Sequence, residues 1–456
     1  MTRIVVGLLA VLLANTAAAD KPHIVFFLAD DMGFADVGFH GSEIKTPNID
    51  KLAAAGARLE QFYVQPVCSP TRAALMTGRY PIRHGLQVGV VRPWAQYGLP
   101  LDERTLPQAL KEVGYETAIV GKWHLGHFQP EYLPTHRGFD HQYGHYNGQI
   151  DYFTHIRDDG FDWHKDDKVC RDEGYTTHLI ANEACRIVAG HDPKTPLFLY
   201  VPFNAVHAPH QVLAKYKEPY LKLKEPRRTY AGMVAAMDEA IGQIVAAIDK
   251  RGMRQETLFI FCSDNGGPQP GVVTDNGKLR AGKTTVYEGG VRVCACAVWD
   301  GHIKPGSVVN EPLHMVDWYP TILKLAGAKL EQKHPLDGRD AWPTLTDGKP
   351  SPHGEILLNA TPAGGAIRVG NWKFVLNGGP QDGDNPVPKK KAGPEKIELF
   401  DMSNDMSEAN NLAAEQPDKV KELRARYEAY LKEALPPKGG PKPADFKSPK
   451  VWGEKD

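Results

Sequence analysis

Four short apolar runs recur along the chain, and each ends in polar side chains. They cover residues 24–29, 117–120, 197–201 and 258–262. Runs that stay apolar at every position are typical of strands buried on both faces of a parallel sheet. Segments with helical periodicity at residues 105–113, 176–188 and 231–250 lie among them, each followed closely by glycine. This pattern predicts an α/β fold with a large, mainly parallel sheet sandwiched by helices.

The polar residues after these runs share one place in the predicted fold. In chain order they are Asp30 and Asp31, then Lys122 and His124, then Asn204 and His207, and finally Asp264 and Asn265. Ligands of open α/β sheets bind beyond the carboxyl ends of the strands. We therefore expect these side chains to meet at one edge of the sheet.

The pattern changes after about residue 364. Residues 366–376 alternate as a half-buried antiparallel strand would, and a Gly/Pro/Lys-rich loop follows. Another strand-like run at residues 397–402 precedes a helical segment at 419–434. We predict a larger N-terminal α/β domain at residues 20–364, which carries the polar cluster, and a smaller C-terminal α+β subdomain with an antiparallel sheet and a helix at 365–456. Residues from 436 onward are expected to form a loose extension.

The N-terminal residues 1–19 have a different composition from the rest. Arg3 precedes an apolar run at residues 4–13, and three alanines follow at 17–19. This order is typical of a secretory signal peptide, here cleaved before Asp20. We expect a secreted protein, or a periplasmic one in a Gram-negative host. No later stretch of the sequence is apolar for long enough to predict a membrane span.

Charge and cysteine content bear on the class of binding partner and on disulfide bonding. Lys and Arg number 54 against 55 Asp and Glu, so the net charge of −1 argues against nucleic-acid binding. Among the six cysteines, Cys170 and Cys185 are a possible disulfide pair in an exported protein. The three remaining cysteines besides Cys68 lie in apolar runs and are expected to fill core space: Cys262, Cys294 and Cys296.

The segment around Cys68 carries the most specific pattern, because residues 68–79 read CSPTRAALMTGR. Ser69 is a plausible helix N-cap, proline suits the next position, and Gly78 suits the end of the helix. Cys68 then lies at a helix N-terminus, where free N–H groups favour an anion. Arg72, one turn later, shares that face and suits a tetrahedral oxyanion such as sulfate. The alternative is an ordinary buried cysteine before a capped helix.

Two of the strand ends also suggest a metal site. Asp30 and Asp31, with Asp264 and Asn265, offer only oxygen ligands, which Ca²⁺ and Mg²⁺ prefer. A lone Asp-Asp pair is more often a helix cap or a surface turn. Two such clusters on neighbouring strand ends favour the metal.

Residues 68–79 resemble the signature C-x-P-x-R-x-x-x-x-T-G-R of the type I, formylglycine-dependent sulfatases in the alkaline phosphatase superfamily. Residues 121–126, GKWHLG, and residues 282–293, GKTTVYEGGVRV, resemble two further segments of that family. The resemblance extends over residues 22–415 and is closest to the arylsulfatase B-like (N-acetylgalactosamine-4-sulfatase-like) group. It implies an alkaline phosphatase-like fold and a sulfuric ester hydrolase.

The resemblance also implies roles for individual residues. A formylglycine-generating maturase would oxidise Cys68 to formylglycine, whose aldehyde hydrate is the nucleophile. This residue would bind the metal, usually calcium, together with Asp30, Asp31, Asp264 and Asn265. The sulfate would be held by Arg72, Lys122 and Lys283, with His207 at the leaving oxygen. His124 would take a proton from the second hydroxyl of the hydrate and so expel sulfate.

The substrate is less constrained by the sequence. Residues 145–148, HYNG, depart from the group's pattern in a loop expected to face the sugar. His145, Asn147, Gln149 and Asp151 are candidate substrate-binding residues, and structural roles in turns are the alternative. A sulfated polysaccharide is expected, either a glycosaminoglycan with N-acetylgalactosamine 4-sulfate or an algal galactan.

Two other functions stay open at this point. A phosphate or phosphonate monoester hydrolase shares the fold and is distinguished by its ratio of phosphate to sulfate ester turnover. A non-catalytic binder of sulfated glycans is the other, if residue 68 remains a thiol. The sequence does not predict the oligomeric state.

Overall fold

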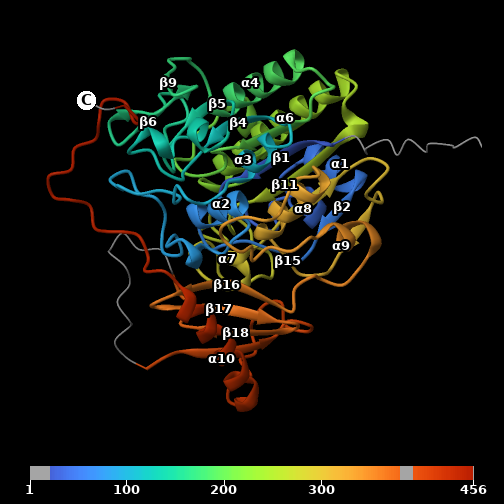
Figure 1. Cartoon of the computed structure of the whole chain (residues 1–456), viewed down its shortest axis with the longest axis vertical. Coiled ribbons are helices and arrows are strands. Elements are labelled where there is room, and N and C mark those ends of the chain that lie inside the picture. The colour runs from blue at the N-terminus through green and yellow to red at the C-terminus, as the bar shows by residue number, and fades with distance from the viewer. Residues whose placement is uncertain (1–20, 381–393, 455–456) are drawn as a thin grey trace, which may run out of the picture.

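A ten-stranded sheet forms the centre of the molecule (Figure 1). The computed structural model describes residues 21–380 and 394–454, so the expected signal peptide at residues 1–19 lies outside the described residues. The strands follow one another across the sheet in this order: β14 (Ser307–Val309), β2 (Ala57–Leu59), β13 (Ala295–Val298), β11 (Thr257–Ser263), β1 (His23–Ala29), β10 (Leu197–Pro202), β4 (Glu116–Lys122), β5 (His141–His145), β8 (His164–Lys165) and β9 (Lys168–Val169).

The middle of this sheet is parallel and its outer parts are mixed. β11, β1, β10, β4 and β5 run in the same direction. Antiparallel pairs flank them, β13 on β11 at one side and β8 on β5 at the other. All four apolar runs of the sequence form central strands, so the predicted α/β fold with a mainly parallel sheet is confirmed at the centre of the sheet.

Helices cover both faces of the sheet. The helices are α1 (Pro47–Ala55), α2 (Cys68–Thr77), α3 (Leu106–Lys111), α4 (Thr176–Gly190), α5 (Ala214–Lys217), α6 (Arg227–Lys250), α7 (Glu288–Val291), α8 (Trp318–Leu325), α9 (Trp342–Asp347) and α10 (Pro417–Glu433). Successive side chains of β1 point to opposite faces, so Phe26 packs in one core and Phe27 in another. The first core includes α2, α3 and α8, and the second includes α1, α4 and α6.

Among the described residues, α6 is the one helix with the length and apolar composition that a membrane span requires. Met233, Ile241 and Ile248 on this helix are fully buried in the core beside α4.

The C-terminal subdomain is built on a second, antiparallel sheet, drawn in orange and red in Figure 1. Its strands are β16 (Glu355–Thr361), β17 (Gly364–Val369), β18 (Trp372–Leu376) and β19 (Ile397–Asp401), and α10 packs against it. The boundary predicted at residue 365 falls inside β17. The single strand predicted over residues 366–376 is wrong, because Gly370 turns the chain with a φ of 55° and makes a hairpin of β17 and β18.

Residues 435–454, which we name the C-terminal strap, are an ordered part of the fold. The strap leaves α10 and returns along the main domain to β6 (Ile156–Arg157) and β7 (Gly160–Phe161), as Figure 1 shows. Leu435 N–H donates to Ile82 O at 2.8 Å, and Trp94 Nε1 donates to Gly440 O at 3.1 Å. Trp452 is only 2% exposed. The loose extension predicted from residue 436 is therefore wrong, because long-range contacts order a segment of loop-like composition.

All six cysteines lie within the described residues, and each is a free thiol. The possible disulfide between Cys170 and Cys185 is therefore not formed. Cys262, Cys294 and Cys296 are buried, as expected of cysteines that fill core space.

A third, small sheet joins β12 (Arg292–Val293), β3 (Phe62–Tyr63) and β15 (Leu313–His314).

Candidate active site

Neighbouring strands deliver the predicted polar side chains to one edge of the large sheet. β1 and β11 pair in register up to Ala29 and Ser263, so Asp30 and Asp264 leave the sheet side by side. β10 and β4 continue the sheet on the other side of β1. Lys122 is the last residue of β4. The carboxyl ends of four parallel strands thus surround one point of the structure.

α2 carries Cys68 to this point. Cys68 is the first residue of the helix, and Gly78 ends the helix with a φ of 66°. Ser69, predicted as the N-cap, lies instead within the first turn. Its hydroxyl donates to His124 O at 2.8 Å and accepts from Val91 N–H at 3.0 Å. Ser69 therefore ties two loops to α2, while the free N–H groups of the helix favour negative charge near Cys68.

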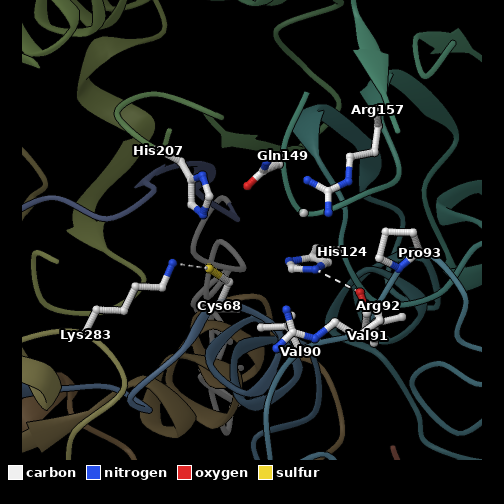
Figure 2. A pocket seen from close by; sticks show the side chains of 11 residues that line it. Cys68, Val90, Val91, Arg92, Pro93, His124, Gln149, Arg157, His207 and Lys283 are labelled. Atoms are coloured by element: carbon white, nitrogen blue, oxygen red, sulfur yellow. Dashed lines mark hydrogen bonds between the residues drawn. The ribbon is translucent and has the colours of Figure 1, made fainter. Parts of the chain in front are cut away.

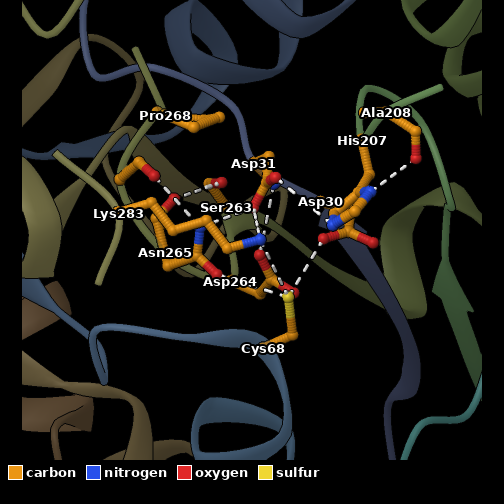
Figure 3. A network of polar contacts seen from close by, with 12 residues as sticks. Asp30, Asp31, Cys68, His207, Ala208, Ser263, Asp264, Asn265, Pro268 and Lys283 are labelled. Atoms are coloured by element: carbon orange, nitrogen blue, oxygen red, sulfur yellow. Dashed lines mark hydrogen bonds and ion pairs between the residues drawn. The ribbon is translucent and has the colours of Figure 1, made fainter. Parts of the chain in front are cut away.

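Cys68 is buried among polar groups, with 1% of its surface exposed (Figure 3). Its Sγ lies 3.4 Å from Asp30 Oδ1, 3.5 Å from Asn265 Oδ1 and 3.6 Å from Lys283 Nζ. Burial, and then the negative charges of Asp264 and Asp30, raise the pKa of Cys68 well above its ordinary value. A neutral thiol is a weak nucleophile, so this environment does not favour thiolate catalysis.

Three cations neutralise three buried carboxylates around Cys68. The pairs are Arg72 Nη2 with Asp264 Oδ2 at 2.8 Å, Lys122 Nζ with Asp30 Oδ2 at 2.5 Å, and Lys283 Nζ with Asp31 Oδ1 at 2.6 Å. Burial and the charge of Asp30 raise the pKa of Asp264. At Asp31 burial acts in the same direction, but the charges of Lys283 and His207 outweigh it and lower the pKa. Buried charges of this kind persist only when they are paired.

The same side chains can hold a divalent metal. One ligand atom each from Asp30, Asp31, Cys68 and His207 lies within 4.8 Å of the others. Asn265 adjoins this group, since its Nδ2 donates to Asp31 Oδ1 at 2.8 Å. Oxygen-rich clusters suit hard cations such as Ca²⁺ and Mg²⁺. Asp30, Asp31 and Asn265 supply oxygen atoms of this kind, so the donor set fits the metal.

Two histidines lie on either side of Cys68. His207 Nε2 is 3.5 Å from Asp31 Oδ2, and burial lowers the pKa of His207 to about 3. His124 Nε2 lies 3.1 Å from Val91 O, and since a carbonyl only accepts, this nitrogen carries the proton. Nδ1 of His124 is then the basic nitrogen. Burial and the charge of Lys122 lower the pKa of His124 well below its ordinary value, so the ring is neutral at pH 7.

A pocket of about 90 Å³ opens over Cys68 (Figure 2). This volume suits a small tetrahedral group better than a whole sugar. The lining residues are Cys68, Val90, Val91, Arg92, Pro93, His124, Gly148, Gln149, Arg157, His207 and Lys283. Arg72 and Lys122 lie behind this lining, fully buried on the carboxylates, whereas Lys283 reaches the pocket itself.

The four candidate substrate-binding residues occupy different environments. Gln149 lines the pocket. His145 and Asn147 have no exposed surface, and Asn147 Nδ2 donates to Asp162 at 2.9 Å. The Asp151 carboxylate accepts from the N–H groups of residues 153 and 154 and from the Gln211 amide, as in a turn. The structure therefore brings one of the four into the pocket wall.

Two arginines of the pocket were not predicted from the sequence. Arg157 lies on β6, in a hairpin of Asp and Gly residues, and Arg92 lies in a loop after α2. Neither belongs to a motif with a recognisable spacing. A positively charged residue in a loop is usually a solvated surface residue, so the sequence held no signal that distinguished them.

Comparison with known proteins places the chain in a family. The sulfatase family profile matches residues 22–328. Arylsulfatase J of Mus musculus is 40% identical over 472 aligned residues, which cover 94% of this chain and 79% of that protein. N-acetylgalactosamine-6-sulfatase of Mus musculus is 34% identical over an alignment that covers 75% of this chain and 69% of that protein. The crystal structure of Ps i-CgsB in complex with k-i-k-neocarrahexaose has a TM-score of 0.83 at 33% identity, covering 92% and 95%.

These matches agree with the geometry at the edge of the sheet. Members of the sulfatase family generally use a divalent metal and a formylglycine made from a cysteine or serine. The buried Asp-Asp-Cys-His group fits such a centre. The chain belongs to the sulfatase family and is a sulfuric ester hydrolase.

Proposed function

We propose that this protein hydrolyses sulfate monoesters of a sulfated carbohydrate, with a formylglycine made from Cys68 and a bound Ca²⁺ ion. The observation that carries the proposal is the small pocket in which Cys68, Lys283, His124 and His207 meet. Sulfated polysaccharides are the proposed substrate class, because Ps i-CgsB was solved with a carrahexaose and a relative is named for N-acetylgalactosamine. N-acetylgalactosamine 4-sulfate and 6-sulfate are both candidates.

Formylglycine would supply a hydrated aldehyde as nucleophile, and a Ca²⁺ ion held by Asp30, Asp31, Asp264 and Asn265 would polarise the sulfate. The rest of the chemistry falls to the chain's own side chains. Of the three cations paired with carboxylates around Cys68, Lys283 is the one that lines the pocket, so it neutralises charge on the sulfuryl oxygens. Arg72 and Lys122 hold the Asp264 and Asp30 carboxylates in place from behind.

The two histidines move protons at opposite sides of the pocket. His124 accepts the proton of the second hydroxyl of the hydrate. It does so at Nδ1, because its Nε2 proton is donated to Val91 O. His207 gives a proton to the leaving alcohol oxygen. Its Nδ1 proton is held by Ala208 O at 2.6 Å, so the proton for the alcohol sits on Nε2 of a doubly protonated ring. Burial disfavours that charge in the free protein, whereas the Asp31 carboxylate, 3.5 Å from Nε2, and the bound sulfate ester favour it.

The test is sulfate release by protein co-expressed with a formylglycine-generating maturase. The substrates are a small aryl sulfate, N-acetylgalactosamine 4-sulfate and 6-sulfate, a sulfated galactan oligosaccharide and a matched aryl phosphate. Mass spectrometry of the peptide that contains residue 68 reports its conversion. We expect sulfate release to depend on that conversion and to exceed phosphate release.

Two variants make the test specific. Cys68→Ala removes the proposed nucleophile, whereas Cys185→Ala removes a half-buried thiol on α4, away from the site. We expect release to be lost in the first and retained in the second. Sulfate release by Cys68→Ala, or faster cleavage of the phosphate ester by the converted protein, would refute the proposal.

Export is part of the same proposal. A polysaccharide-degrading enzyme meets its substrate outside the cytoplasm, and residues 1–19 have the composition of a signal peptide. Sequencing the N-terminus of the mature protein from its host tests this. A mature chain that begins at Asp20 is the expected result, and a chain that retains Arg3 contradicts it.

A further inference from the structure

The pocket over Cys68 has cationic side chains on more than one side. Among the described residues, its lining includes three cationic side chains, Lys283, Arg92 and Arg157, and no carboxylate. Lys283 lies 3.6 Å from Cys68 Sγ and serves the reacting group. Figure 2 shows Arg157 across the pocket from Lys283, with its guanidinium extended toward Gln149 and His124. Arg157 therefore faces a different part of the substrate from Lys283.

The Arg157 guanidinium is incompletely satisfied. Within the described part of the chain, its ion pair is with Asp158, whose Oδ2 lies 3.3 Å from Nε and whose side chain is 39% exposed. Nε is buried and makes no hydrogen bond there. Burial lowers the pKa of Arg157, Asp158 partly offsets this effect, and the like charge of Arg92 adds to it. An anion beside Arg157 would stabilise its guanidinium, which binds carboxylates and sulfates through paired hydrogen bonds.

The C-terminal strap fixes Arg157 in this position. Trp452 Nε1 donates to Arg157 O at 2.8 Å, and Trp452 N–H donates to Phe161 O at 2.9 Å. Gly160 lies between them so tightly that a Cβ there would come within 2.5 Å of Pro449 O. The buried Trp452 ring also packs edge-on to His127. The hairpin that carries Arg157 is thus clamped against the main domain.

We propose that Arg157 is a specificity-determining residue that binds a second anionic group of the saccharide, a sulfate or a carboxylate, next to the sulfate that is cleaved. Trp452 is the positioning residue that holds Arg157 toward the pocket. The inference rests on the proposed function and names the substrate class more narrowly: a saccharide with at least two anionic groups close together.

The test compares kcat/KM of the fully converted protein on four substrates. These are a small aryl sulfate, a sulfated sugar with no other anion, the same sugar with a second sulfate, and the same sugar joined to a uronate. The decisive quantity is the ratio of kcat/KM on each dianionic sugar to that on the monosulfated sugar. Wild type is expected to show a ratio of about ten or more on one of the two, which identifies the second anion.

Arg157→Gln should reduce that ratio by about tenfold, mainly through KM. Arg171→Gln is the matched control, since Arg171 is an exposed arginine stacked on Phe161 of the same hairpin and does not line the pocket. Trp452→Phe keeps the aromatic ring, removes the N–H donor, and should raise KM for the preferred dianionic sugar more than for the monosulfated one.

The outcomes separate the two proposals. Two results overturn the inference and leave the sulfatase function standing, provided that the wild type turns over the aryl sulfate. The first is a wild-type ratio of dianionic to monosulfated kcat/KM near one. The second is a ratio that Arg157→Gln leaves unchanged. An equal loss in Arg157→Gln and Arg171→Gln also overturns it, because the effect would then be one of general charge. A converted protein that releases sulfate from none of the four substrates refutes the proposed function and the inference with it.

Discussion

The environment of residue 68 is set by the N-terminus of α2 and by carboxylates at the ends of the sheet strands. The first turn of α2 directs free N–H groups toward it, yet Asp30 and Asp264 surround it with negative charge. Burial and these two carboxylates raise the pKa of the Cys68 thiol, so the unmodified side chain stays neutral. Oxygen atoms at the same position would suit both a divalent metal and the helix N-terminus.

Cys68→Ser should stall after one turnover. A serine ester has one ester oxygen and no second hydroxyl, so release of sulfate would require water to attack sulfur. We expect a burst of about one equivalent of alcohol per active site from an aryl sulfate, followed by a steady rate lower by several orders of magnitude than in wild type. Stopped-flow absorbance measures both phases. Rapid multiple turnover by Cys68→Ser would contradict the hydrate chemistry, and Cys185→Ser serves as the control.

At the scale of elements, the C-terminal sheet supports the loop that carries Lys283. Lys373 on β18 is fully buried, and its Nζ lies 2.9 Å from Glu288 Oε1 and 2.7 Å from Glu408 Oε1. Glu288 is the first residue of α7, which directly follows the segment with Lys283. A buried ion cluster therefore joins the second sheet to one side of the active site.

Lys373→Met should destabilise the protein by about 3–5 kcal/mol, because it leaves Glu288 and Glu408 buried without their cation. Urea unfolding followed by circular dichroism measures the loss. Lys396→Met is the matched control, since Lys396 is 61% exposed and its pair with Glu398 spans 3.2 Å. Its cost should stay below about 1 kcal/mol. Equal losses in the two variants would show that the cluster does not anchor the sheet.

The sequence predicted those elements whose pattern is local. Strands buried on both faces are apolar at every position, and the motifs mark their ends, so β1, β4, β10 and β11 and their polar neighbours were predictable. The strap was not, because Trp452 is ordered by contacts with residues 127 and 157 and not by its own neighbours. Burial of His145 and Asn147 also depends on packing between distant segments, which a hydrogen-bonding side chain does not reveal.

At the scale of the whole molecule, buried histidines outside the site make the fold sensitive to acid. Burial lowers the pKa of His23 to about 4 and the pKa values of His84 and His314 to about 3. Both ring nitrogens of His84 are buried without hydrogen bonds in the described structure. Val316 N–H donates to Nδ1 of His314 at 3.2 Å, which requires that nitrogen to be unprotonated. These rings are neutral in the folded state.

The free energy of unfolding should therefore fall as the pH drops below 6.5. Unfolded histidines take up a proton near pH 6.5, whereas the folded rings stay neutral until about pH 4 or 3, so protons favour the unfolded chain in this window. One pH unit below 6.5 the loss is roughly 1.4 kcal/mol for each such histidine. Urea midpoints at pH 7.5 and 5.5 measure it, with chelator present at both values so that metal binding does not contribute.

His84→Leu assigns part of this slope to one residue. The substitution removes a group that must charge on unfolding in acid, so the stability difference between pH 7.5 and 5.5 should shrink by roughly 1 kcal/mol. His302→Leu is the control, because His302 is exposed and its removal leaves the buried rings in place. A slope that His84→Leu leaves unchanged would mean that His84 is already protonated in the folded protein. Stability that rises toward pH 5.5 would show that carboxylates, and not histidines, govern the acid response of this fold.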